Sequence, residues 1–139
     1  MTVDDTIPMR LRRAYLTMHR VAQAHFAEFG ITVDQYVLMS VLAEAEGIIQ
    51  TQLSERMSSD ANTVGAMLKL LEQKNVIRRQ PSDRDRRAQR VYLTASGKRL
   101  HKKLVRHSSQ IHQTLEAALT PRKRQTLLNG LDEITRALQ

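Results

Sequence analysis

The chain has 139 residues, a net charge of +8 and a pI of about 10.4, which favours a single domain with a polyanionic partner, either nucleic acid or an acidic membrane surface. Cys is absent, so disulfides, thiolate zinc sites and thiol redox sensing are excluded. The sequence lacks an apolar run of about 18 residues, as a membrane span requires, and its first residues lack the apolar segment of a secretory signal. We therefore expect a cytoplasmic protein.

Two helices are predicted in the first third of the chain. Apolar residues recur at helical spacing over residues 9–29, with Pro8 suited to the first turn and Gly30 suited to the C-terminal stop. Thr32 and Gln35 then form the T-x-x-Q pattern of a capping box, which opens a second helix. Because aromatic residues make up only 4% of the chain, the core between these helices must be mainly aliphatic.

A helix-turn-helix is predicted over residues 51–73. Its first helix is expected to begin at Thr51, whose hydroxyl can cap free backbone N–H groups, and to bury Leu53 and Met57. Residues 58–60 supply a polar turn and the N-cap of the second helix. That helix has an apolar stripe (Val64, Met67, Leu68, Leu71) and an opposite face that is small and polar (Asn62, Thr63, Ala66, Lys69, Gln73). Such a helix has the shape that enters a DNA major groove.

An arginine-rich loop between two predicted strands follows. Asn75 suits the left-handed stop of the preceding helix, and Val76–Ile77 and Val91–Leu93 are typical of antiparallel strands, with Ile48–Ile49 as a short third member. The loop, Arg78–Arg90, contains six Arg and two Asp and so carries +4. A charged run is as often only a solvated surface, but beside a groove-shaped helix it favours contacts with phosphates or a narrow minor groove.

Two further helices are predicted to complete the chain. A long helix begins at Thr94, and a last helix begins at Thr120, with Pro121 at its first position. Their apolar positions, together with those of the first helix, exceed what a winged unit of about 45 residues can cover. We therefore predict that the outer helices pack on a second copy in a two-fold dimer, with a monomeric bundle as the alternative.

The order of elements, the DRDRR sequence at Asp83–Arg87 and the LTASG sequence at Leu93–Gly97 resemble the MarR family of winged helix-turn-helix transcription regulators. The resemblance covers nearly the whole chain. It implies a mainly α fold with a small antiparallel β wing, in which residues 1–139 form a single domain. Residues 31–97 would form the DNA-binding lobe, and residues 1–30 and 98–139 the dimerisation helices. It also implies a bacterial protein that associates with the nucleoid when bound to DNA.

Base reading is expected from the outer face of the second helix of the helix-turn-helix. Asn62 can make a bidentate pair with adenine, Thr63 can meet a thymine methyl group, and Lys69 is expected to take part. Related sequences often carry Arg where this chain has Ala61 and Ala66, so less hydrogen bonding to guanine and more reliance on apolar contact and DNA shape are expected. Residues expected to contact DNA from the two helices are Thr51 and Ser59, nearer phosphates, and Asn62, Thr63, Ala66 and Lys69.

The wing is expected to contact DNA through Arg84, Arg86 and Arg87. By resemblance, either Arg84 or Arg86 enters the minor groove. Asp85 is expected to pair with an arginine and hold the shape of the wing rather than to touch DNA.

A metal site and an enzyme activity are not expected. The histidines are separated by gaps that place sequence neighbours on different helix faces, whereas a helical zinc pair needs i, i+3 or i, i+4 spacing (His19, His25, His101, His107, His112). There is also no Gly-rich phosphate loop and no nucleophile elbow. A contact between His19 and His107 across helices is the one alternative for a metal site, and no cofactor is predicted.

A small-molecule pocket is implied by the resemblance, since related proteins bind aromatic acids where the dimerisation helices meet the winged unit. Tyr and His would supply the few polar groups that such an otherwise apolar pocket needs. The alternative is an ordinary packed core in which these groups are satisfied. The residues expected at this junction are Tyr15, Met18, His19, Ala22, Tyr36, Met39, Ser40, His107 and Ile111.

The function predicted from these observations is that of a homodimeric, sequence-specific repressor, released from a pseudo-palindromic operator by a small aromatic or anionic effector. One alternative is an architectural protein that binds DNA by charge, indifferent to sequence. Another is a winged-helix module that binds an acidic protein. An anionic-membrane binder is disfavoured, because no basic helix with a bulky apolar face is present.

Overall fold

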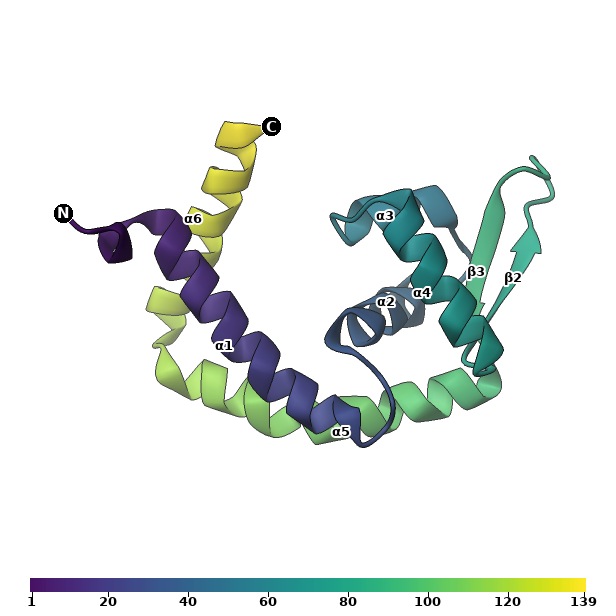
Figure 1. Ribbon diagram of the computed structural model, residues 1–139, viewed down its shortest axis with the longest axis horizontal. Helices are drawn as coiled ribbons and strands as arrows, with labels where there is room; N and C mark the ends of the chain where they lie inside the picture. The colour runs from purple at the N-terminus through teal and green to yellow at the C-terminus, as the bar shows by residue number, and fades with distance from the viewer. The chain divides into compact units, whose positions relative to one another are not determined.

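The computed structural model describes all 139 residues and confirms the predicted fold class: six α-helices and a small three-stranded antiparallel sheet (Figure 1). The chain forms two compact units, residues 1–107 and residues 108–139. None of the helices combines the length and the apolar character needed to cross a membrane.

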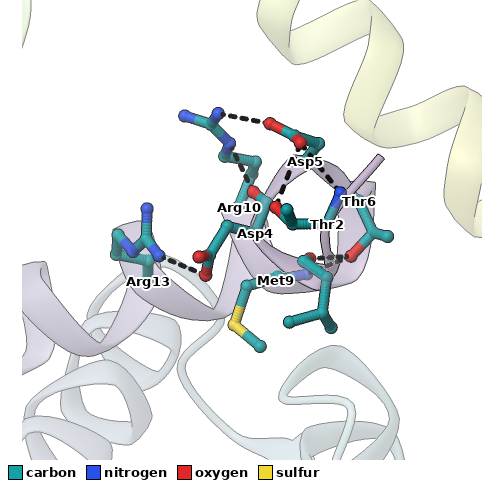
Figure 2. A network of polar contacts seen from close by, with 8 residues as sticks. Thr2, Asp4, Asp5, Thr6, Met9, Arg10 and Arg13 are labelled. Carbon is teal, nitrogen blue, oxygen red and sulfur yellow. Dashed lines mark hydrogen bonds and ion pairs between the residues drawn. The ribbon is translucent and has the colours of Figure 1, made fainter.

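The first unit begins with a capped turn, η1 (Val3–Asp5), followed by α1 (Ile7–Ala27). The hydroxyl of Thr6 accepts a hydrogen bond from the backbone N–H of Met9 at 3.4 Å, so α1 begins two residues before the predicted position. Figure 2 shows how the arginines of this helix fold back on the turn: Arg13 Nη2 lies 2.9 Å from Asp4 Oδ1, and Arg10 Nη2 lies 3.5 Å from Asp5 Oδ1. Two cations of α1 are thereby neutralised within the chain.

The capping box predicted for α2 (Val33–Glu44) is confirmed. The Gln35 backbone N–H donates to Thr32 Oγ1, and the Thr32 backbone N–H donates to Gln35 Oε1, each at 3.0 Å. After α2, Gly47 has a φ of +81°, which Gly adopts without steric cost, and turns the chain into β1 (Ile48–Ile49).

The helix-turn-helix consists of α3 (Gln50–Arg56) and α4 (Ala61–Gln73). The prediction that Thr51 caps α3 is wrong. The helix begins at Gln50 directly after β1, its N-cap residue is Ile49, and no side chain caps it. The cap predicted for α4 is confirmed, because Asp60 accepts a 2.7 Å hydrogen bond from the backbone N–H of Thr63.

The sheet has the order β1-β3-β2, with β2 spanning Ile77–Pro81 and β3 spanning Gln89–Leu93. Asn75 has a φ of +59°, so it ends α4 in the predicted left-handed conformation. The arginine-rich loop is shorter than predicted: residues 78–81 and 89–90 are paired strand residues, and only residues 82–88 connect the strands. Figure 1 shows this hairpin projecting beside α4.

The core of the first unit is mainly aliphatic, as the composition predicted, with Phe26 as its one buried aromatic residue, and is centred on α2. Leu38 and Leu42 of α2 are fully buried in a cluster with apolar residues of α3, α4, the sheet and α5 (Ala95–Ala118). The buried stripe of α4 is the predicted one, with Val64, Leu68 and Leu71 at 0% exposure and Met67 half-buried. Leu104 fixes the first half of α5 on the same cluster.

The second unit contains the end of α5 and α6 (Pro121–Leu138). Thr120 caps α6 as predicted, since its hydroxyl accepts from the backbone N–H of Lys123 at 3.2 Å. The apolar stripe of α6 stays partly exposed: Leu127 and Leu128 are 48% and 49% accessible, whereas Leu131 and Ile134 are half-buried.

Candidate nucleic-acid interface

The outer face of α4 is exposed and lacks carboxylates over its first ten residues. Asn62, Ala66 and Lys69 are all exposed on this face. The side chains of Asn62 and Lys69 make no hydrogen bond or ion pair within the chain, so their donors and acceptors are available to a ligand. Amide and ammonium groups of this kind match the edges of bases and the phosphates beside them.

Thr63 is less available than the sequence indicated. Its hydroxyl donates to Asp60 Oδ2 at 2.9 Å while its backbone N–H donates to Asp60 Oδ1. The backbone hydrogen bond from Thr63, followed by the hydroxyl bond, lowers the pKa of Asp60 and keeps this carboxylate ionised. The methyl group of Thr63 is therefore the part of its side chain that remains available for contact with a base.

The wing loop is braced by its own backbone. The carboxylate of Asp85 accepts a 2.9 Å hydrogen bond from the backbone N–H of Arg87, and the backbone N–H of Ser82 donates to the carbonyl of Ala88 at 2.8 Å. The predicted ion pair between Asp85 and an arginine is therefore absent, although Asp85 does hold the shape of the loop. Arg84, Arg86 and Arg87 are exposed, and their guanidinium groups are unpaired.

The other three arginines of the predicted loop are structural, because they lie on the strands. Arg79 makes a bidentate pair with Glu72 of α4, with Nη2–Oε1 at 2.9 Å and Nε–Oε2 at 3.3 Å. The Arg79 hydrogen bond lowers the pKa of Glu72. Arg90 donates to the carbonyl of Gly47 at 2.9 Å, and Arg78 stacks 4.1 Å above the ring of Tyr92. Sequence reasoning could not assign these roles, since they depend on strand register.

A concavity of about 420 Å³ lies between α3, the start of α4 and the wing. It brings together two residues predicted to contact DNA, Thr51 and Arg87, and places them beside Gln50 and Arg79. Ser59, predicted to lie nearer phosphates, is half-buried in the turn that precedes Asp60.

The residues predicted for an effector pocket are only partly brought together. Tyr36 and Ser40 of α2 are half-buried and Met39 lies in the core, whereas Tyr15 and Met18 are exposed on α1. The ring contact of Tyr15 with His19 is local to α1, with centroids 5.7 Å apart, whereas that of His107 reaches from α5 to Phe29, just after α1, at 4.7 Å. Ile111 belongs to the second unit and is half-buried there.

His101 lies beside two of the predicted effector-pocket residues but was not itself predicted for that pocket. Its ring stacks on Tyr36 with centroids 5.7 Å apart, and its Nε2 lies 3.0 Å from Ser40 Oγ. Since the Ser40 hydroxyl donates to the carbonyl of Tyr36 at 2.9 Å, the contact requires Nε2 to carry the hydrogen. Burial lowers the pKa of His101. The available signal was its position three residues before Leu104 in the stripe of α5.

Comparison with known proteins decides the family. The MarR family model matches residues 31–88. The transcriptional regulator HosA of Escherichia coli is 32% identical over 98 residues, which cover 66% of this chain and 73% of HosA. The chain belongs to the MarR family. It is therefore a DNA-binding transcriptional regulator and not an enzyme.

Solved structures of the MarR family share the fold over nearly the whole chain. A mutant MarR from E. coli complexed with operator DNA is 25% identical with a TM-score of 0.84, over 96% of this chain and 99% of that one. BpsR of Bordetella bronchiseptica, whose DNA binding is regulated by 6-hydroxynicotinic acid, is 22% identical with a TM-score of 0.88, over 97% of this chain and 96% of BpsR.

Proposed function

We propose that this MarR-family regulator is a homodimeric repressor that reads a pseudo-palindromic operator and is released by a small aromatic or anionic effector. The proposal rests on one observation: the first unit has two neighbouring surfaces whose polar groups have no partner within the chain. The outer face of α4 presents free amide and ammonium groups, and the wing presents three unpaired arginines. A helix of this kind fits a major groove, and guanidinium groups fit the adjacent phosphates or minor groove.

The dimer is supported by apolar surface that the chain leaves in water. Along α1, Ile7 is 61% exposed, Tyr15 54% and Val21 47%. Leu127 and Leu128 are about half exposed on α6. Continuous apolar stripes of this kind mark protein interfaces, and a two-fold dimer would present two copies of α4 about one helical turn of DNA apart.

The effector is supported by the groups between α2 and α5 and by the likeness to BpsR. Tyr36, Ser40 and His101 place a phenol, a hydroxyl and an imidazole, the last two hydrogen-bonded to each other, beside apolar core residues, and a few polar groups in an apolar setting are the composition of a small-molecule site. An effector acts only if it binds the non-DNA conformation more tightly. A compound that binds this protein without changing its DNA affinity would not be an effector, and a panel with only such compounds would refute this part of the proposal.

The test is binding of the purified protein to the DNA upstream of its own gene and to random DNA, across a salt titration. We expect affinity for the upstream DNA to exceed that for random DNA by about a thousandfold, with a palindromic footprint and the sedimentation mass of a dimer. The Asn62→Ala variant should lose about 1–3 kcal/mol on the upstream DNA and little on random DNA.

Two outcomes would replace the proposal. Equal affinity for both DNAs with a steep salt slope, unaffected by Asn62→Ala, would indicate an architectural binder that holds DNA by charge. Undiminished DNA affinity after replacing Arg84, Arg86 and Arg87 by Ala would show that the wing serves another partner, such as an acidic protein.

A further inference from the structure

The first half of α5 carries more positive charge than the wing. Residues 98–107 include five Lys or Arg and no acid, so they hold +5, whereas residues 78–90 hold +4. Since the whole chain carries +8, all other residues together carry −1. The excess positive charge therefore lies in two segments, and the proposed operator contacts use only one of them.

The five cations form a basic ridge, consisting of Lys98, Arg99, Lys102, Lys103 and Arg106. All five are exposed, and Leu104 holds the opposite face of α5 in the core. Lys98, Lys102 and Arg106 form one row at i, i+4 spacing and Arg99 and Lys103 a second, so successive cations in a row are roughly 6 Å apart along the helix.

Most of this ridge is free of partners within the chain. Lys98 pairs with Glu46 at 2.8 Å. Arg99, Lys102 and Lys103 make no hydrogen bond or ion pair through their side chains. The wing likewise presents three unpaired arginines. The two segments therefore offer equal numbers of free cations to a polyanion.

A structural role does not account for the ridge. Like charges at i, i+4 destabilise a helix, and the ridge contains three such pairs. Elsewhere the chain pairs several of its cations, as Arg10 and Arg13 are paired in Figure 2 and as Arg56 is paired with Glu44. Repulsion among most of the ridge cations is not relieved by acidic residues of the chain. This indicates that an external anion neutralises them.

The position of the ridge separates its ligand from the operator. Figure 1 shows α3 and the first half of α5 on opposite sides of α2, and α4 and α5 each bury one face in the core around α2. DNA is stiff over about 150 bp, so a short operator held by α4 and the wing cannot curve round to the ridge. A linear polyanion on the ridge is therefore a separate molecule or a distant segment.

We propose that the basic ridge binds the phosphate backbone of a second DNA duplex, without reading its sequence, and that the protein thereby bridges two DNA segments. Duplex DNA carries one negative charge per about 1.7 Å of its axis, which provides phosphates for both rows of cations. Bridging rests on the proposed binding of operator DNA by α4 and the wing. Binding of a duplex by the ridge itself does not depend on the proposed operator binding.

The test compares three variants that each lose three positive charges. The ridge variant is R99A/K102A/K103A, and the wing variant is R84A/R86A/R87A. The matched control is R12A/R122A/K123A, which removes exposed, unpaired cations outside both segments. DNA upstream of the gene is fixed to beads, and capture of a labelled random-sequence duplex by the bound protein is measured. Anisotropy titrations of the random duplex against salt are run in parallel.

The ridge variant is expected to lose about tenfold or more of the capture, and its log–log salt slope for capture should fall by up to about three, while its affinity for the bead-bound DNA is kept. The control should capture like the wild type. Because three like-charge helix pairs are removed, the ridge variant should melt at the same temperature as the wild type or higher.

Unchanged capture by the ridge variant, or equal loss in the control, would overturn the proposal. Binding of the ridge to anionic-lipid vesicles without capture of a duplex would overturn it as well. A failure of the proposed operator binding gives a different result. The wing variant would then keep full affinity for the bead-bound DNA, and in the anisotropy titration only the ridge variant would lose affinity for the random duplex.

Discussion

Gly97 is the position where one added methyl group should damage the fold most. A Cβ on Gly97 would lie 2.0 Å from the carbonyl oxygen of Val76 and 3.0 Å from its carbon. That carbonyl cannot yield easily, because it accepts a hydrogen bond from the backbone N–H of Thr94 at 3.0 Å and shares the hydroxyl hydrogen of Thr94 with the carbonyl of Asn75, at 3.1 Å and 2.7 Å respectively. Relief of the clash requires α5 to move away from the start of β2.

The expected cost follows from these contacts. Overpacking of this kind costs about 1–3 kcal/mol, and loss of the Thr94 hydrogen bonds adds about 1 kcal/mol each. Replacing Gly by Ala inside a helix returns about 1 kcal/mol. Gly97→Ala should therefore lower the free energy of unfolding by about 2–4 kcal/mol.

Urea denaturation followed by circular dichroism, at one fixed protein concentration, measures the effect. Gly65→Ala is the matched control, since its Cβ would lie at an ordinary 3.8 Å from Gln50 Nε2 and the variant should gain up to about 1 kcal/mol. If Gly97→Ala unfolds at the same urea concentration as Gly65→Ala, the close approach of α5 to Val76 is not a constraint and the reasoning fails.

Two further predictions concern charged and titrating groups. Glu72→Ala and Arg79→Ala should each lower the free energy of unfolding by about 0.5–1 kcal/mol, because the pair is partly exposed, with side-chain exposures of 42% and 24%. A double-mutant cycle with zero coupling energy would show that the ion pair adds nothing to the apolar packing of β2 on α4. His101 has a pKa lowered by burial below its usual 6.5, so the unfolded state binds its proton more readily, and stability should fall as the pH drops below about 6.5. Denaturation of His101→Gln at several pH values should show less of this fall, and an identical fall would assign the titration to another group.

The elements predicted well are those that local physics decides. The stripe of α4 follows from its 3.6-residue period, and the caps at Thr32, Asp60 and Thr120 need only a hydroxyl or carboxylate three residues before a free N–H. Asn75 ends α4 for the same kind of reason, since Asn tolerates a positive φ. These features could be read without knowledge of the rest of the chain.

The wrong predictions concern residues whose positions depend on the pairing of the strands. Ile48 and Ile49 pair with Val91 and Arg90 of β3, which carries the chain straight into α3 and leaves Thr51 inside the helix rather than at its cap. The register that places Arg78 opposite Tyr92 converts a supposed loop arginine into a stacked one. A long-range register of this kind is absent from any local pattern.

These corrections change how the proposed operator would be read. Since the hydroxyl of Thr63 is committed to Asp60 and position 66 is an alanine, Asn62 and Lys69 are the predicted base-reading residues that keep polar groups for directional hydrogen bonds. Two such groups discriminate few base pairs at about 1–3 kcal/mol each. The remaining specificity of the proposed repressor must then come from the wing arginines and the deformability of the DNA. Base substitutions that widen the minor groove under the wing should therefore weaken binding as much as substitutions under Asn62.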